Sequence, residues 1–152
     1  MFVAIRIRGT VESSKKIIDA LSMLRLKNLN NCVVIPETKE YLGMLKKVKD
    51  YITWGKIDDK TLSKLLEKRC KILGDKPIDK ESLKQITEFD DFDKFADALI
   101  KGEVNLKEFN QIKPYFRLNP PRHGHKALKL PYPRGSLGYR AEKINELLER
   151  MI

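Results

Sequence analysis

The N-terminal third of the chain shows strand-like and helical patterns in turn. In residues 2–9, Ile5 and Ile7 alternate with Arg6 and Arg8, which is the period-two pattern of a half-buried strand. We expect the two isoleucines to face a core. Arg6 and Arg8 are expected to point outward, toward the open face or the edge of a sheet.

The patterns continue to residue 58 as three strands and two helices. Apolar spacing and breaker residues predict a helix over 14–24, a strand over 32–35, a second helix from residue 37 and a short strand over 53–57. This order predicts a small two-layer α+β unit. Both helices are expected on one face of the sheet, and the other face is expected to stay open.

Residues 59–116 are predicted to form a helical insert packed beside the sheet. An amphipathic helix over 59–73 is stopped by the breaker sequence at 74–77, and two further helices are expected over about 79–88 and 91–101. The remainder of this insert has a less regular pattern.

Residues 117–140 have a different character. Residues 119–126 combine two prolines, a glycine and basic side chains, which excludes a helix or a central strand there. The extended pattern continues to residue 135, and a short helix over 140–151 closes the chain. Because an extended backbone cannot satisfy its own N–H and C=O groups, we expect this segment to need an outside partner.

The charge balance favours a polyanionic partner. The chain has 31 Lys and Arg against 21 Asp and Glu, a formal net charge of +10 and a pI near 9.6, as is usual for proteins that bind nucleic acid. Residues 1–74 carry a surplus of +8, residues 75–110 a charge of −4, and residues 111–152 a surplus of +6. We expect RNA at the two ends of the chain, and solvent or protein at the acidic middle.

The candidate RNA-binding residues are basic, amide, imidazole and aromatic side chains near the predicted turns and in the extended segment. They are Arg6, Arg8, Lys15, Lys16, Arg25, Lys27, Asn28, Lys56, Arg69, Arg117, Asn119, Arg122, His123, His125, Lys126, Lys129, Arg134, Tyr139 and Arg140. Cations contact phosphate, and Tyr139, like Tyr132, is suited to stack on unpaired bases.

Simpler interpretations stay open for several of these positions. The segment 117–140 also fits an ordinary surface loop. Arg25 also fits a residue that only complements the dipole of the preceding helix. Trp54 is expected to complete the core rather than to stack on a base.

The sequence offers no recognisable catalytic or metal site. It contains neither G-x-x-x-x-G-K-[ST] nor G-x-S-x-G. His123 and His125 lack further ligands at zinc-like spacing, so we expect them to donate hydrogen bonds to RNA. Cys32 is expected to be a buried free thiol, with no disulfide to Cys70. An acylphosphatase of similar fold would need a glycine-rich stretch ending in arginine, which the loop 9–14 lacks.

Three stretches in series resemble one protein family. Residues 5–9 and 24–26 resemble the start of the ribosomal L-thirty family, which is the L-seven family in the eukaryotic naming. Residues 51–55 resemble its third strand. Residues 119–124 through 138–148 are similar to the C-terminal part of its long archaeal form. Together these stretches cover essentially the whole chain in order.

The resemblance implies a ferredoxin-like core bound to large-subunit (23S-type) rRNA, near 5S rRNA and neighbouring large-subunit proteins. Bacterial members resemble only residues 1–58, so this segment is the expected core. A helical insert over 59–116 and an extended basic segment with a C-terminal helix over 117–152 complete the expected organisation. The first strand begins without the long basic arm of eukaryotic members, which favours an archaeal source.

These inferences predict a non-enzymatic structural constituent of the large ribosomal subunit. No cofactor and no small-molecule substrate is expected. No signal peptide is visible and no apolar run approaches the roughly 20 residues of a membrane span, so we expect a cytoplasmic, ribosome-bound protein. The alternative is a non-ribosomal RNA-binding factor in RNA processing.

Overall fold

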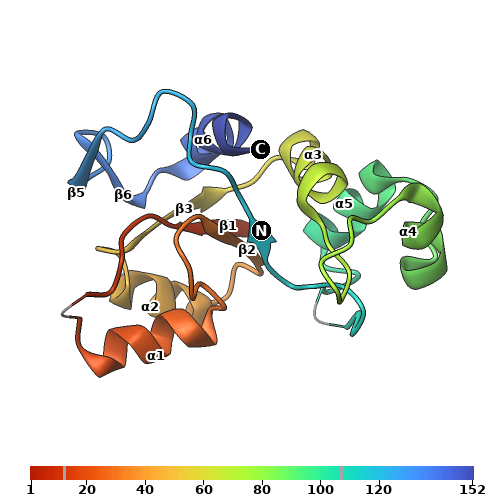
Figure 1. Cartoon of the computed structure of the whole chain (residues 1–152), viewed down its shortest axis with the longest axis horizontal. Coiled ribbons are helices and arrows are strands. Elements are labelled where there is room, and N and C mark those ends of the chain that lie inside the picture. Colours follow the sequence, from red (N-terminus) through yellow and green to blue (C-terminus); the bar gives the residue numbers. More distant parts are fainter. Residues whose placement is uncertain (12, 107) are drawn as a thin grey trace.

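The chain folds around one six-stranded sheet that has helices on both faces (Figure 1). The computed structural model describes residues 1–11, 13–106 and 108–152. The strands are β1 (Phe2–Arg6), β2 (Asn31–Ile35), β3 (Ile52–Lys56), β4 (Phe116–Arg117), β5 (Ala127–Pro131) and β6 (Gly135–Tyr139). The helices are α1 (Lys15–Met23), α2 (Lys39–Lys47), α3 (Asp59–Arg69), α4 (Lys80–Thr87), α5 (Phe92–Lys101) and α6 (Ile144–Met151), with a 3-10 helix η1 (Ala141–Lys143) before α6. Within the described ranges, no helix has the length and apolarity needed to span a membrane.

Strand β1 lies between β2 and β3 in the middle of the sheet. The strand order is β4-β2-β1-β3-β6-β5, and β1 pairs antiparallel with both neighbours. The register aligns Ala4 with Val33 of β2 and with Trp54 of β3. The predicted α+β class and the ferredoxin-like β-α-β-α-β order of the N-terminal third are confirmed.

Helices α1 and α2 cover one face of the sheet. Phe2 and Ala4 of β1 pack in this layer with Leu21 of α1 and Leu45 of α2. Trp54 of β3 belongs to the same cluster and is only 5% exposed. The prediction that this tryptophan completes the core is confirmed.

The opposite face is covered by α3, α5 and α6, so the prediction of two layers and an open face was wrong. Val3 and Ile5 of β1 pack there with Leu65 of α3, Phe95 of α5 and Leu148 of α6. The start of β1 is apolar at successive positions, which is the pattern of a strand buried on both faces. The helical insert and the C-terminal helix supply the covering layer and share one core with the sheet.

Arg6 lies inside the protein, contrary to the prediction that it faces outward. It is 5% exposed, and its guanidinium donates hydrogen bonds to the backbone carbonyls of Leu26, at 3.0 Å, and Lys27. It also donates to the carbonyl of Arg8 at 3.0 Å and to Thr10 Oγ1 at 3.2 Å. Because Arg6 satisfies carbonyls at the turn between α1 and β2, we correct its role from phosphate contact to structural residue.

Helix α3 ends at Arg69, earlier than the predicted residue 73. The chain then forms a tight antiparallel bridge between Lys71 and Pro77. Gly74 and Asp75 form the turn with positive φ angles of 97° and 62°. The helical spacing of apolar residues continues past Arg69, so the sequence pattern overestimated the length of α3. The helix ends earlier because of the bridge, which depends on residues that follow the breaker sequence at 74–77.

Part of the extended segment has its hydrogen-bond partners within the protein, contrary to the expectation that it needs an outside partner. β6 pairs parallel with β3, and the N–H of Arg140 donates to the carbonyl of Trp54 at 3.0 Å. The N–H of Asn119 donates to the carbonyl of Met151 at the end of α6, also at 3.0 Å. The expectation failed because these partners lie far away along the chain. β5 pairs with β6 at the edge of the sheet, and its residues are exposed throughout.

Arg140 is also a buried residue, which corrects its assignment as an outward phosphate contact. It is 8% exposed, its Nε donates to Thr53 Oγ1 at 2.9 Å, and its Nη2 donates to the carbonyl of Ser136 at 2.9 Å. The guanidinium lies over the ring of Tyr132, 5.1 Å from the centroid. Arg140 therefore joins β6 to β3.

Replacing Arg6 by methionine is expected to lower the free energy of unfolding by about 2–4 kcal/mol, because buried carbonyls lose charged donors. Arg8→Met, at a half-buried side chain, is the matched control and is expected to cost less than about 1 kcal/mol. Urea denaturation followed by circular dichroism measures both values. Equal losses for the two variants would contradict the structural role of Arg6.

Gly55→Ala is expected to destabilise the fold by about 2–3 kcal/mol through overpacking. A Cβ at this position of β3 would overlap the carbonyl oxygen of Ala141 and press on Ile144. Gly43→Ala, where nothing lies within 4 Å, is the control; removing glycine from a helix is expected to stabilise by up to about 1 kcal/mol. Thermal unfolding measures the stability of both variants. Equal stability of Gly55→Ala and Gly43→Ala would refute the close approach of η1 to β3.

Candidate nucleic-acid interface

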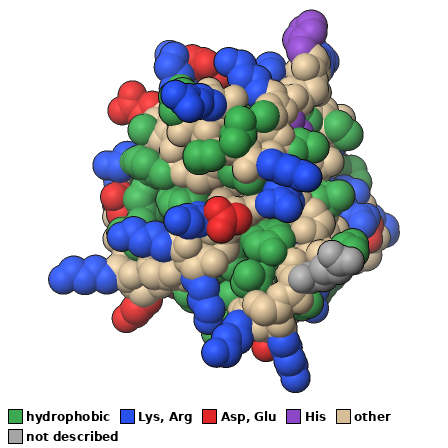
Figure 2. All heavy atoms as spheres, turned by 90° about the vertical axis from the view of Figure 1, so that its left-hand side faces the viewer, with side chains coloured by type: hydrophobic (Ala, Val, Ile, Leu, Met, Phe, Trp, Pro, Cys, Tyr) green, Lys and Arg blue, Asp and Glu red, His purple; other side chains and the backbone are tan. Residues whose placement is uncertain are grey.

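The N-terminal and C-terminal basic segments both reach one end of the molecule. Helices α1 and α2 and strands β5 and β6 lie at the left of Figure 1, whereas α4 and α5 of the acidic middle lie at the right. Figure 2 faces the left-hand end and shows Lys and Arg side chains spread across it, with hydrophobic side chains between them. This arrangement is suited to a polyanion that meets one end of the protein.

A hollow of about 530 Å³ opens beside the turn between α1 and β2. This turn hollow is lined by Ser22, Arg25, Lys27, Asn28, Asn31, Asp75, Tyr115 and Arg117. The pairing of β2 with β4 assembles it, because Asn31 stands opposite Arg117 in the register. Predicted RNA-binding residues from two distant segments, Arg25, Lys27 and Asn28 on one side and Arg117 on the other, therefore share one site.

Arg25 occupies a backbone position that favours glycine. Its φ angle is 60°, in the left-handed region. The N–H of Leu26 donates to the carbonyl of Leu21 and that of Arg25 to Ser22, both at 2.9 Å, which is the Schellman ending of a helix. A non-glycine residue in this conformation costs about 1 kcal/mol. An arginine at such a strained position is typical of a functional residue.

The electrostatics of the turn hollow favour an anion. Asp75, the one carboxylate among its described lining residues, accepts a hydrogen bond from Lys113 at 2.8 Å. That hydrogen bond, with the attraction of Lys113 and then of Lys71 and Arg117, lowers the pKa of Asp75. Across the described ranges, no carboxylate lies within 4.0 Å of the cationic nitrogens of Arg25 or Arg117, and the same holds for Lys27.

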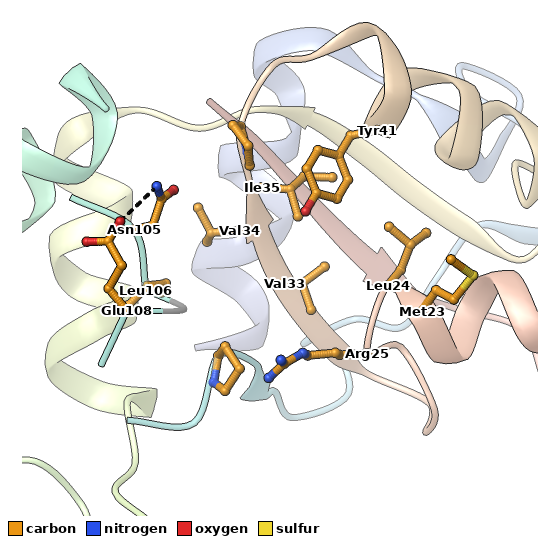
Figure 3. A pocket seen from close by; sticks show the side chains of 12 residues that line it. Met23, Leu24, Arg25, Val33, Val34, Ile35, Tyr41, Asn105, Leu106 and Glu108 are labelled. Carbon is orange, nitrogen blue, oxygen red and sulfur yellow. Dashed lines mark hydrogen bonds between the residues drawn. The ribbon is translucent and has the colours of Figure 1, made fainter. Parts of the chain in front are cut away.

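An apolar hollow of about 340 Å³ lies between the end of α1, β2 and the residues Asn105, Leu106, Glu108 and Pro114, and it shares Arg25 with the turn hollow (Figure 3). The side chains of Val33, Ile35 and Tyr41 line it, and Arg25 extends along its border. Arg25 thus belongs to both hollows. An apolar lining suits an apolar group rather than a phosphate.

A second basic hollow, of about 400 Å³, lies between the β5–β6 connection and α6. Its cations are Lys126, Arg140, Lys143 and Arg150. Lys143 is hydrogen-bonded to Glu146 at 2.6 Å, and Arg140 makes the internal contacts given above. Lys126 and Arg150 are therefore the cations of this hollow that remain most available to a phosphate.

His125 is half-buried next to this basic hollow. Burial, and then the positive charges of Arg140 and Arg150, lower the pKa of its imidazole. Its Nδ1 is buried and has no hydrogen-bond partner in the part of the chain that the structure describes. His123 is exposed at a turn with a φ angle of 64°.

Most of the other predicted residues are exposed but lie outside the turn hollow. Arg8 lies over the ring of Tyr51, 5.5 Å from the centroid, and Lys15 and Lys16 are exposed in the first turn of α1. Residue 12, in the loop 9–14 considered above, is outside the described residues. The C-terminal segment presents exposed side chains of Asn119, Arg122, Lys126, Lys129, Arg134 and Tyr139.

Two predicted residues are tied to other groups of the protein. Lys56 pairs with Glu37 at 3.8 Å, between two exposed side chains. Arg69 donates from Nη2 to the carbonyl oxygen of Ile152 at 2.5 Å. Arg69 therefore joins α3 to the end of α6, and its predicted RNA contact stays a prediction.

Sequence reasoning missed several residues of the two basic hollows, among them Asn31, Tyr115, Lys143 and Arg150. Asn31 was visible only as the last residue of a polar, basic turn. Tyr115 lay in a stretch without a regular pattern, and Arg150 followed the apolar face of the last helix. Of these residues only Asn31 offered a signal in the sequence, because amide side chains near cations are common in RNA-binding turns.

The described residues hold no group of three His, Cys, Asp or Glu side chains that could bind a metal. Cys32 and Cys70 are both buried free thiols, as expected for Cys32. Burial raises the pKa of Cys70 to about 12. This thiol is therefore a poor nucleophile at neutral pH.

Comparison with known proteins identifies related chains. The family model described as "Ribosomal protein L30p/L7e" matches residues 2–52. The large ribosomal subunit protein uL30 of Archaeoglobus fulgidus is 46% identical over 151 residues, which are 99% of each chain. The proteins of the same name from Methanosphaera stadtmanae and Methanocorpusculum labreanum are 46% and 41% identical, over 100% and 99% of each chain. The similarity therefore extends through the insert and the C-terminal segment.

The lowered pKa of His125 predicts a dependence of stability on pH. The folded state resists protonation of this ring, so stability is expected to fall as the pH drops below about 6.5, the ordinary pKa of histidine. The loss is expected to level off once the pH is below the folded-state pKa. Urea denaturation at a series of pH values measures the loss of stability. The difference between wild type and His125→Gln gives the part of that loss that comes from His125. His123→Gln is the matched control and is expected to keep the wild-type profile.

Proposed function

The chain belongs to the ribosomal protein L30p/L7e family and is a structural constituent of the large ribosomal subunit; on that premise we propose that it binds large-subunit rRNA. The proposed contacts are the turn hollow and the exposed basic side chains of the C-terminal segment. The protein neutralises phosphates and holds rRNA helices in their relative positions. This is a scaffold role without a chemical step.

The convergence of cations in the turn hollow is the observation that supports this proposal most directly. Arg25 and Lys27 approach Arg117 only because β2 pairs with β4. A fold that needed these cations only for solubility would gain nothing from gathering them, since like charges repel. A phosphate between them removes that repulsion and releases counterions.

The acidic middle fits the same proposal. Helices α4 and α5 lie at the end of the molecule away from β5 and β6 (Figure 1). Carboxylates held away from the RNA avoid repulsion by phosphate. We propose that this end meets neighbouring ribosomal proteins, and that the protein lies near 5S rRNA, as the family resemblance implies. As a member of the family, it is a cytoplasmic, ribosome-bound protein.

The alternative is a free factor in RNA processing, which would use the same basic surfaces. Sedimentation of large subunits after a high-salt wash separates the two functions. A structural constituent is expected to stay with the washed subunits. Recovery of the chain in the wash would overturn the ribosomal proposal and favour the processing factor.

Arg25→Gly is expected to weaken rRNA binding while it stabilises the fold. Loss of one phosphate contact reduces the slope of log affinity against log salt concentration by about one. Glycine relieves the left-handed strain and is expected to raise the free energy of unfolding by up to about 1 kcal/mol. Filter binding to transcribed large-subunit rRNA at several salt concentrations, beside urea denaturation, measures the two effects.

Two further variants calibrate this experiment. Arg117→Ala, on the opposite wall of the turn hollow, is expected to change the salt slope by a similar amount. Lys94→Ala, at an exposed position of α5, is expected to leave both affinity and slope unchanged. Weaker binding by Lys94→Ala than by Arg25→Gly would mean that the RNA meets the other end of the molecule.

A further inference from the structure

The turn hollow contains groups that a phosphate alone does not use. We infer that it receives one unstacked nucleotide of the rRNA, with the base against Tyr115 and the phosphate at Arg25 and Arg117. The inference rests on the proposed rRNA binding and specifies how this site takes part in it.

The size of the turn hollow fits such a ligand. Its volume of about 530 Å³ lies within the range of small-molecule sites, roughly 300–1,000 Å³. A hollow of this size beside cations is suited to a nucleotide that has left its stack.

Asn31 points to a hydrogen-bond donor on the ligand. It is 3% exposed, and its Oδ1 is buried with no hydrogen-bond partner anywhere in the described ranges. An unpaired buried acceptor is costly, so a partner from outside the chain stabilises it. A phosphate oxygen accepts and cannot fill this need. An amino or imino group of a base, or a 2′-hydroxyl, donates and can.

Tyr115 provides an aromatic surface at the same place. Its half-buried side chain lines the turn hollow and also the neighbouring space toward residues 109–114. Aromatic rings stack on bases that have been turned out of an RNA helix, with little preference for sequence. The carboxylates of an acidic peptide would satisfy Arg25 and Arg117, and its backbone N–H groups would suit Asn31, but its peptide backbone offers no aromatic face to stack on this ring.

The arrangement separates the two halves of a nucleotide. Cations at Arg25, Lys27 and Arg117 favour the phosphate, while Asn31 and Tyr115 favour the base and sugar. Asp75 does not oppose this, because Lys113 holds its carboxylate at 2.8 Å. The turn hollow thus offers cations for the phosphate of a single nucleotide, and a hydrogen-bond acceptor and an aromatic ring for its base and sugar.

The test uses the full chain bound to transcribed large-subunit rRNA. Ultraviolet crosslinking is expected to join Tyr115 to an unpaired nucleotide. Replacing that nucleotide by an abasic one and Tyr115→Leu are each expected to weaken binding roughly ten- to hundredfold. Because the abasic nucleotide already lacks the stacking contact that Tyr115→Leu removes, the two changes together are expected to cost no more than the abasic change alone. Tyr115→Phe keeps the ring and is expected to bind within about twofold of wild type.

The outcomes distinguish this inference from the proposed function. If the rRNA binds but no crosslink reaches Tyr115, or the two losses add, the nucleotide site is refuted while rRNA binding stands. If the wild-type chain does not bind the rRNA, the proposed function fails as well. Circular dichroism checks the fold of Tyr115→Leu. Should that variant not fold, the abasic rRNA on the wild-type chain decides, and an unchanged affinity overturns the inference.

Discussion

Burial of β1 on both faces is the constraint from which the rest of the structure follows. Alternate residues of this strand pack beneath α1 and α2 on one side and beneath α3, α5 and α6 on the other. Helices therefore cover both faces of the central strands, whereas β5 at the edge of the sheet stays exposed. Some RNA-binding domains stack bases on an exposed sheet face, and the central strands of this fold are closed to that mode of binding. The nucleic-acid contacts that we propose lie at the rim of the sheet, where turns and strand ends reach the surface.

Two buried arginines hold that rim in place. Arg6 donates to the carbonyls of Leu26 and Lys27, and so fixes the turn that carries Arg25. Arg140 joins β6 to β3 through Thr53. The planar guanidinium donates several hydrogen bonds in fixed directions, which lysine cannot do. In this protein internal arginines position the loops, and exposed ones remain available to phosphate.

The turn hollow shows how stability and charge are balanced at the interface. Arg25 stands where glycine would be less strained, and it lies near a second cation on β4. The repulsion between the two cations costs free energy in the isolated chain, and a bound anion would offset it; the backbone strain at Arg25 is a separate cost that the hydrogen bonds at the end of α1 accompany. Asp75, which would otherwise oppose an anion, is neutralised by Lys113. The charges of the turn hollow are thus arranged as the anionic ligand that we propose would require.

Local patterns in the sequence determined the order of the helices and of the first three strands, because periodicity and breaker residues act over a few neighbours; the pairing of β4, β5 and β6 was not predicted. The net charge and the family resemblance likewise pointed to RNA and to the ribosome. Tertiary structure alone decided that Arg6 and Arg140 turn inward, that a second helical layer covers the sheet, and that Arg25 meets Arg117. Each of these depends on pairing between residues distant along the chain, such as β2 with β4 and β3 with β6. No local pattern encodes such a pairing, because the alternation of apolar and polar residues is the same whichever strand lies alongside.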